Sequence, residues 1–222
     1  MKRIKGSLYL NSIIFILVFL GTTFMITGFH FMSDEVILES TKLNAFKFFT
    51  VDSNILMGLI ALLFVYFEYQ IIKKRKKTIP QELYVMKLMF TVGVMVTFLV
   101  TTLYLAPFSP NGYFSMFQNS NLFFHLIVPI LSLISFIFFE KTDKIKFKHT
   151  FLGMVPTLTY AIFYVANILV HLENGKVSYT YDWYGFAQGG LASTLFVFIF
   201  MHLATYIVSL SLWFLNRKKV GK

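Results

Sequence analysis

Six long apolar runs dominate this sequence and limit the folds that it can adopt. The runs lie at about 8–29, 46–71, 84–107, 119–139, 150–171 and 188–214. Each is long enough to cross a bilayer as a helix, which takes roughly 20 apolar residues. None alternates with a period of two, so we expect helices rather than strands. The sequence therefore predicts an all-α, polytopic integral membrane bundle of six transmembrane helices, in a single domain that covers residues 1–222.

The basic residues are distributed as in a multi-span membrane protein. Only 14% of the residues are charged, whereas soluble domains contain about a quarter. Basic clusters occur at alternate connections, at 2–5, 73–77, 141–148 and 217–222. By the positive-inside rule these clusters face the cytoplasm, so we expect both termini there and the protein in the cell membrane. Because the positive charge is divided among separate loops, we do not expect nucleic-acid binding.

The second run begins with an unusual density of polar residues. Four of five consecutive positions near its outer end are polar, namely Thr50, Asp52, Ser53 and Asn54. On a helix Thr50, Ser53 and Asn54 share one face, because they are spaced i, i+3 and i+4. Asp52 points about 160–200° away from Thr50, so it joins that face only if the helix is distorted. Polar side chains in a span tend to face the bundle interior and to mark functional sites.

The fourth run carries a histidine at a matching depth. Asn121 and His125 share a helical face, and His125 lies about as far below the outer surface as Thr50. Pro129 has no N–H, so we expect the His125 carbonyl to lose its helical partner beside a bend. A threonine hydroxyl needs an adjacent base to act as a nucleophile, and neutral imidazole suits that role. These residues suggest a Thr50–His125 catalytic pair, with the ring oriented by Asp52, Asn121 or the freed carbonyl.

Three alternatives remain open from the residues alone. The first is structural, because a threonine in a membrane helix commonly bonds its own i−4 carbonyl and a lone histidine can be a packing partner. The second is a transporter or binding protein for a small solute or a proton, which would use the same outer polar cluster without covalent chemistry. The third is a zinc-dependent hydrolase, with ligands drawn from His125, His171, Asp182 and His202. Glu68, at the inner end of the second run, is interpreted as interfacial and structural.

Two segments resemble motifs of a known family. Residues 48–56, Phe-Phe-Thr-Val-Asp-Ser-Asn-Ile-Leu, are similar to the second-helix motif of a family of six-span integral membrane proteins. Its animal members are the androgen-induced gene product and the androgen-dependent TFPI-regulating protein, and it has many bacterial relatives. Residues 121–129, Asn-Leu-Phe-Phe-His-Leu-Ile-Val-Pro, resemble the family's Asn-x-x-x-His motif with a following proline, and residues 179–183 resemble its Tyr-rich segment before the last helix.

The resemblance implies an activity. The animal members are intramembrane threonine hydrolases of fatty-acid esters of hydroxy fatty acids, so the resemblance implies Thr50 as nucleophile and His125 as base, acting on a lipid-like ester without a metal or cofactor. The supporting or pocket residues are expected to be Asp52, Ser53, Asn54, Asn121, Tyr181 and Asp182. The animal motif has its carboxylate three positions after the threonine, where this chain has Ser53, and its proline follows the histidine one position later. The chain therefore resembles the bacterial branch more closely.

Overall fold

The structure, a computed structural model, describes residues 1–33 and 42–217. Its α-helices are α1 (Lys2–Thr27), α2 (Phe49–Ile72), α3 (Gln81–Val100), α4 (Ser120–Leu122), α5 (Val128–Ile134), α6 (Val155–Val170) and α7 (Gly190–Asn216). Short π-helical turns extend or interrupt the third and fourth spans, at η2 (Thr101–Leu105), η5 (Phe123–Ile127) and η6 (Ser135–Phe139). The 3-10 helices are η1 (Lys42–Lys47), η3 (Ala106–Phe108), η4 (Tyr113–Phe117) and η7 (Phe147–Met154). Within the described ranges the only β structure is two isolated bridges.

The predicted six spans are confirmed. The continuous helical segments long and apolar enough to cross a membrane are Lys2–Thr27, Phe49–Ile72, Gln81–Phe108, Ser120–Phe139, Phe147–Val170 and Ala192–Asn216. Most of their ends lie within a few residues of the expected ones. The largest difference is in the first span, which starts at Lys2 rather than near residue 8, so its basic residues are already helical. The chain thus has the architecture of a multi-pass integral membrane protein.

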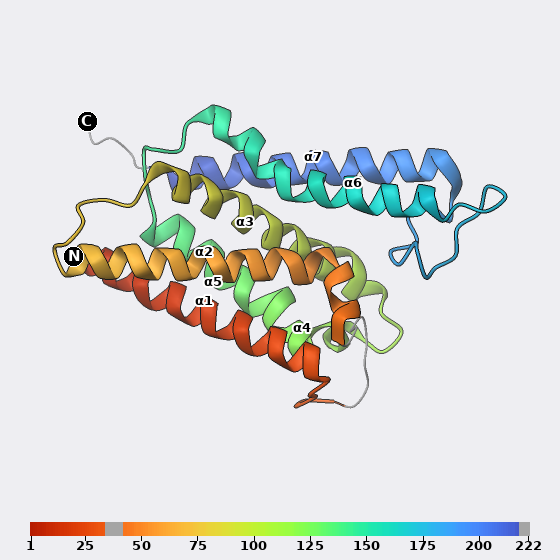
Figure 1. Ribbon diagram of the computed structural model, residues 1–222, viewed down its shortest axis with the longest axis horizontal. Coiled ribbons are helices and arrows are strands. Elements are labelled where there is room, and N and C mark those ends of the chain that lie inside the picture. Colours follow the sequence, from red (N-terminus) through yellow and green to blue (C-terminus); the bar gives the residue numbers. More distant parts are fainter. Residues whose placement is uncertain (34–41, 218–222) are drawn as a thin grey trace.

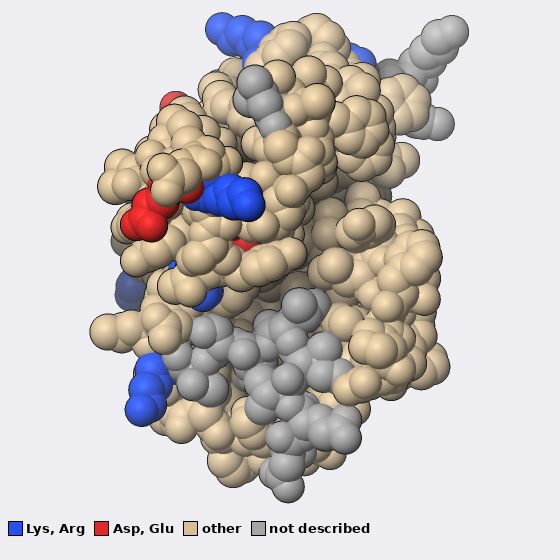
Figure 2. Space-filling model, turned by 90° about the vertical axis from the view of Figure 1, so that its right-hand side faces the viewer, with Lys and Arg blue, Asp and Glu red and all other residues tan. Residues whose placement is uncertain are grey.

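The first residues of α1 and the last residues of α7 lie at the same end of the bundle (Figure 1). The connection between α2 and α3 and the segment after the fourth span lie at this end too, and we call it the basic end because residues 73–77 and 141–148 lie there. At the opposite end the described surface is mostly uncharged, with scattered basic and acidic side chains (Figure 2). This alternation is what the charge pattern predicts, and the assignment of the basic end to the cytoplasm remains a prediction.

Helix α3 is the centre of the bundle. It packs against α2 and α5 on one side and against α7 and η7 on the other (Figure 1). In the third span 50% of the apolar stretch is buried inside the protein, compared with 17% in the fifth span and 22% in the sixth. Two hydrophobic clusters follow from this position, one shared with α1 and α2 and one shared with the fourth span and α7. The polar residues Lys87, Thr91 and Thr97 of α3 are therefore buried within the protein.

Helices α1 and α2 share the most extensive contact of any two elements in the described part of the chain. Gly58 makes their close approach possible, because a Cβ atom at this position would lie 2.8 Å from Cγ1 of Val18. Small residues at such contacts let membrane helices pack closely. Ser53 and Asn54 of α2 are buried, beside Gly93 of α3 and Phe124 of the fourth span, as expected from the i, i+3, i+4 spacing.

Candidate functional site

His125 lies in the π turn η5 and is buried, with 6% of its surface exposed. Its Nδ1 lies 2.8 Å from the hydroxyl oxygen of Thr101, which belongs to the π turn η2 of the third span. Isolated π turns within helices frequently occur at functional sites. The contact orients the ring, and in the tautomer in which Nδ1–H donates to Thr101 it is Nε2 that can serve as a base. Thr101 was not among the residues singled out from the sequence.

The π turn also changes which carbonyl Pro129 leaves free. The N–H of Val128 bonds the carbonyl of Phe123, five residues back. In this register the next N–H in line would belong to Pro129 and would reach the Phe124 carbonyl, but proline has none. Nδ2 of Asn54 donates to that carbonyl instead, at 3.2 Å. In this register the carbonyl that Pro129 leaves without a backbone donor is that of Phe124, whereas a regular α-helix would place it at His125.

Asn54 links the two predicted halves of the site. Its Nδ2 donates to the Phe124 carbonyl and, at 2.8 Å, to the carbonyl of Thr50. The hydroxyl of Ser53 also donates to the Thr50 carbonyl, at 3.1 Å. One buried amide thus joins the backbone of Thr50 to the residue directly before His125. The direct pairing of the Thr50 hydroxyl with the ring remains a prediction, because the hydroxyl that bonds Nδ1 is that of Thr101.

Asp52 lies apart from the Asn54 side of α2. It is half buried and interacts electrostatically with Tyr160 of α6. This agrees with the helical geometry that directed Asp52 away from Thr50. Asn121, the other predicted supporting residue of the fourth span, is buried at the start of that span.

The Tyr-rich segment before α7 adjoins the first turn of α2. The N–H of Phe49 donates to the phenol oxygen of Tyr184 at 3.0 Å, which satisfies one of the free donors at a helix N-terminus. Nε1 of Trp183 donates to the Tyr160 hydroxyl at 2.9 Å, and that hydroxyl donates to the Lys47 carbonyl at 2.6 Å. Burial raises the pKa of Tyr184 well above its usual value, so the phenol stays neutral. The side chains of Tyr160 and Tyr184 thus contact the backbone of Lys47 and Phe49, directly before Thr50.

Asp182 and Tyr181 organise the loop that precedes α7. The buried carboxylate of Asp182 accepts hydrogen bonds from the Tyr164 hydroxyl, from the Ala187 N–H at 3.1 Å and from Nε2 of Gln188 at 2.7 Å. The ring of Tyr181 stacks on His171, with their centroids 3.6 Å apart. The hydrogen-bond partners of Asp182 thus come from α6 and its following loop, so Asp182 acts on the site only through the position of this loop.

The structure gives no support to the zinc hypothesis. Across residues 1–33 and 42–217, no three His, Asp or Glu side chains are grouped so that they could hold a metal ion. Nδ1 of His171 instead contacts the Asn167 carbonyl, and Nδ1 of His202 contacts the Phe198 carbonyl, each at 2.8 Å. Both histidines therefore bond to their own helix, four residues back.

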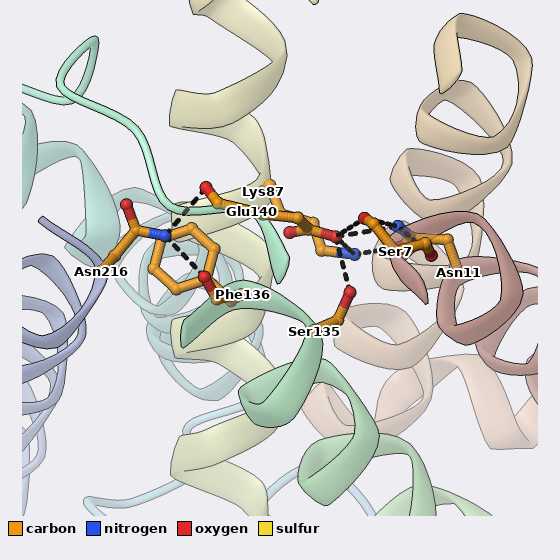
Figure 3. A network of polar contacts seen from close by, with 7 residues as sticks. All are labelled: Ser7, Asn11, Lys87, Ser135, Phe136, Glu140 and Asn216. Carbon is orange, nitrogen blue, oxygen red and sulfur yellow. Dashed lines mark hydrogen bonds and ion pairs between the residues drawn. The ribbon is translucent and has the colours of Figure 1, made fainter. Parts of the chain in front are cut away.

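A second polar cluster, at the basic end, was missed in the sequence. Figure 3 shows its centre, Oε1 of Glu140, which accepts hydrogen bonds from Asn11 at 2.8 Å, Ser135 at 2.7 Å and Ser7 at 3.2 Å. Nζ of Lys87 lies 3.5 Å from the same oxygen and also donates to Oδ1 of Asn11. The cluster joins α1, α3 and the end of the fourth span inside the protein.

Glu68 belongs to this cluster, and its interpretation as an interfacial residue is wrong. Its side chain is only 2% exposed and interacts with Ser7, Asn11, Lys87 and Glu140. Lys87 is fully buried as well, although its charge fits the positive-inside pattern when it is read alone. The sequence does contain an indication of the cluster, because Glu68 and Lys87 both lie inside apolar runs. Ionisable residues in spans commonly face partners within the bundle.

The chain shows no significant match to a family model, a curated protein or a solved structure. Its function is therefore argued from the two polar clusters themselves, one around His125 and one around Glu140.

Proposed function

We propose that this integral membrane protein is a hydrolase of lipid-like esters that uses Thr50 as nucleophile and His125 as general base. The observation that supports it most is the setting of the imidazole. Its Nδ1 contacts the Thr101 hydroxyl at 2.8 Å, and Asn54 connects the backbones of Thr50 and Phe124 beside it. The resemblance of residues 48–56 and 121–129 to a family of threonine hydrolases points to the same two residues.

The chemistry follows from the two ring nitrogens. With Nδ1–H donating to the Thr101 oxygen, Nε2 is unprotonated and can take a proton. The Thr50 oxygen attacks the ester carbonyl as its proton passes to Nε2, and the resulting imidazolium then protonates the departing alcohol. Water attacks the acyl-threonine with His125 again as base, and this step releases the acid and restores the hydroxyl.

The apolar surroundings suit an acyl substrate. Phe48 and Phe123 pack with Met25, Val51 and Phe124 around the first turns of α2. Sites for small molecules are commonly apolar with a few polar groups that fix orientation. A fatty acyl ester has this character, because its one polar group lies at the end of a long apolar chain.

The test is covalent labelling of the full-length protein in lipid nanodiscs with a fluorophosphonate, together with hydrolysis of a fluorogenic fatty acyl ester. We expect Thr50→Ala and His125→Ala to lose labelling and turnover. Thr23→Ala is the control, because the exposed Thr23 hydroxyl bonds only the Phe19 carbonyl of its own helix. If both site variants label as well as the unmodified protein, the proposal fails.

The same experiment distinguishes the two threonines. Thr101 is itself within the distance at which a base can activate a nucleophile. Labelling that persists in Thr50→Ala but is lost in Thr101→Ala would transfer the nucleophilic role to Thr101, with Nδ1 as the accepting nitrogen.

A second candidate function is binding or transport of a proton or small solute without covalent chemistry. It is favoured by the buried charges of Glu68, Lys87 and Glu140, for which the hydrolase proposal has no role. Proton flux into liposomes that contain the protein, reduced by Asp52→Asn or Glu68→Gln and accompanied by no fluorophosphonate labelling, would support this function in place of hydrolysis.

A further inference from the structure

The cluster at the basic end encloses three ionisable side chains. Glu68, Lys87 and Glu140 are each at most 3% exposed, and they come from the second span, the third span and the end of the fourth. The ring of Phe64 covers one side of Lys87, with Nζ 5.2 Å from its centroid. Nδ2 of Asn216, on α7, donates to the Glu140 carbonyl at 3.1 Å and to the Phe136 carbonyl at 2.6 Å (Figure 3). The cluster is therefore surrounded by protein on several sides.

The charges within this enclosure do not balance. If all three side chains were ionised, two carboxylates would face one ammonium. An uncompensated charge in a medium of low dielectric constant is so unfavourable that a buried group usually becomes neutral instead. One added proton would leave one carboxylate, one ammonium and one neutral carboxylic acid.

The hydrogen bonds show which groups lack a partner. Oε2 of Glu68 and Oε2 of Glu140 are both buried, and neither has a hydrogen-bond partner. Both are acceptors when ionised, so they cannot satisfy each other. A proton on one of the two carboxyl groups would supply a donor and remove the excess negative charge at the same time.

The donors around Glu140 decide where the proton resides. Its Oε1 accepts from three side chains and also faces Lys87, and such donors stabilise the ionised form. Glu68 shares Ser7, Asn11 and Lys87 with Glu140, whereas the Ser135 hydroxyl donates to Glu140. We propose that the cluster is a binding site for a single proton, which resides on the carboxyl group of Glu68 at neutral pH.

The other charged and titratable groups near the cluster do not replace this proton. On α1, the Arg3 guanidinium is bonded to the carbonyls of Phe139 at 3.0 Å and Lys141 at 2.9 Å. On α3, Tyr84 interacts electrostatically with both carboxyl groups but is neutral, and Lys144 lies over its ring. Helix α7 contributes the neutral Asn216. The cluster is at the opposite end of the bundle from His125, so this site is independent of the proposed hydrolysis.

Infrared spectroscopy of the full-length protein in lipid bilayers tests the proposal, because a protonated carboxylic acid has a carbonyl stretch separate from that of a carboxylate. We expect this band at pH 7, well above the value of about 4.3 at which glutamic acid titrates in water. We expect ¹³C labelling of glutamate to shift the band and Glu68→Gln to remove it. Glu82→Gln is the matched control, because Glu82 is exposed in the first turn of α3.

A second variant keeps the proposal falsifiable if Glu68→Gln does not fold. Lys87→Met removes the only ammonium of the cluster, so both carboxyl groups should become protonated and the intensity of the band should rise about twofold. Absence of a glutamic acid band at pH 7 in the unmodified protein, a band that persists in Glu68→Gln, or a band that Lys87→Met leaves unchanged would each overturn the proton site.

Discussion

The hydroxyl of Thr101 and Nδ1 of His125 lie 2.8 Å apart, each in a π turn of a neighbouring span. A π turn adds one residue to a helical turn and so rotates the side chains that follow relative to those before it. Here two such turns bring a hydroxyl and an imidazole together inside the bundle, beside the buried Asn54. The contact sets the orientation of the imidazole ring, so its loss should affect catalysis.

Replacement of Thr101 by valine should lower kcat for ester hydrolysis by about 10²-fold, the lower end of what general-base catalysis contributes, with little change in KM. The variant keeps the shape of the side chain but removes the oxygen that holds Nδ1. Thr97→Val is the control, because Thr97 is buried one turn earlier on the same helix and its hydroxyl bonds only the Val94 carbonyl. Equal turnover of the two variants would show that Thr101 does not position the ring.

Replacement of Asn54 by leucine should destabilise the protein by about 1–3 kcal/mol, the range for leaving buried polar groups without partners. The Phe124 carbonyl would lose its side-chain donor, and the Thr50 carbonyl would keep only that of Ser53. Thermal unfolding in detergent micelles measures the change. Asn167→Leu, which removes the exposed bond to the Tyr181 carbonyl, should cost less, and an equal loss in the two variants would contradict this account.

Replacement of Pro129 by alanine should restore a backbone N–H, which in an α-helical register bonds the carbonyl of His125, four residues back. We expect the π turn to relax toward an α-helix, which would rotate His125 away from Thr101. Turnover should therefore fall while the unfolding temperature stays the same or rises, because a backbone hydrogen bond is gained. Unchanged turnover would show that the π turn does not depend on the proline.

Removal of Glu140 should be among the most harmful changes in the chain. Glu140→Leu removes the carboxylate that lies 3.5 Å from Nζ of Lys87, and breaking a buried ion pair typically costs about 3–5 kcal/mol. The double variant Lys87→Met, Glu140→Leu removes both charges and should be more stable than Glu140→Leu alone. Unfolding measurements on the two single variants and the double variant give the coupling, and additive losses would mean that the ion pair contributes nothing.

The spans could be predicted because membrane insertion depends on the length and hydrophobicity of each segment, which are local properties of the sequence. The burial of Ser53 and Asn54 could also be predicted, since it follows from their spacing on one regular helix. Thr101 could not be found in this way. Its contact with His125 depends on two π turns, and the register shift of a π turn is not visible in a hydrophobic pattern.

The Glu140 cluster escaped prediction for another reason. Read one residue at a time, Lys87 fits the positive-inside bias and Glu68 or Glu140 fits a helix end at the membrane surface. Their burial appears only when three spans are brought together, because each is enclosed by side chains of the other helices. Pro129 predicted a carbonyl without a backbone donor at His125. In the π register the carbonyl concerned is that of Phe124, which accepts from Asn54.

The placement of these charges has a consequence for how the chain assembles during synthesis. Helices α2 and α3 are joined by a short connection, so Glu68 and Lys87 reach the bilayer together as a hairpin that carries one charge of each sign. Glu140 is translated later, at the end of the fourth span, and it meets Lys87 only after that span has docked against the hairpin. The ion pair between Lys87 and Glu140 therefore forms only in a chain whose fourth span has been made and packed against α3.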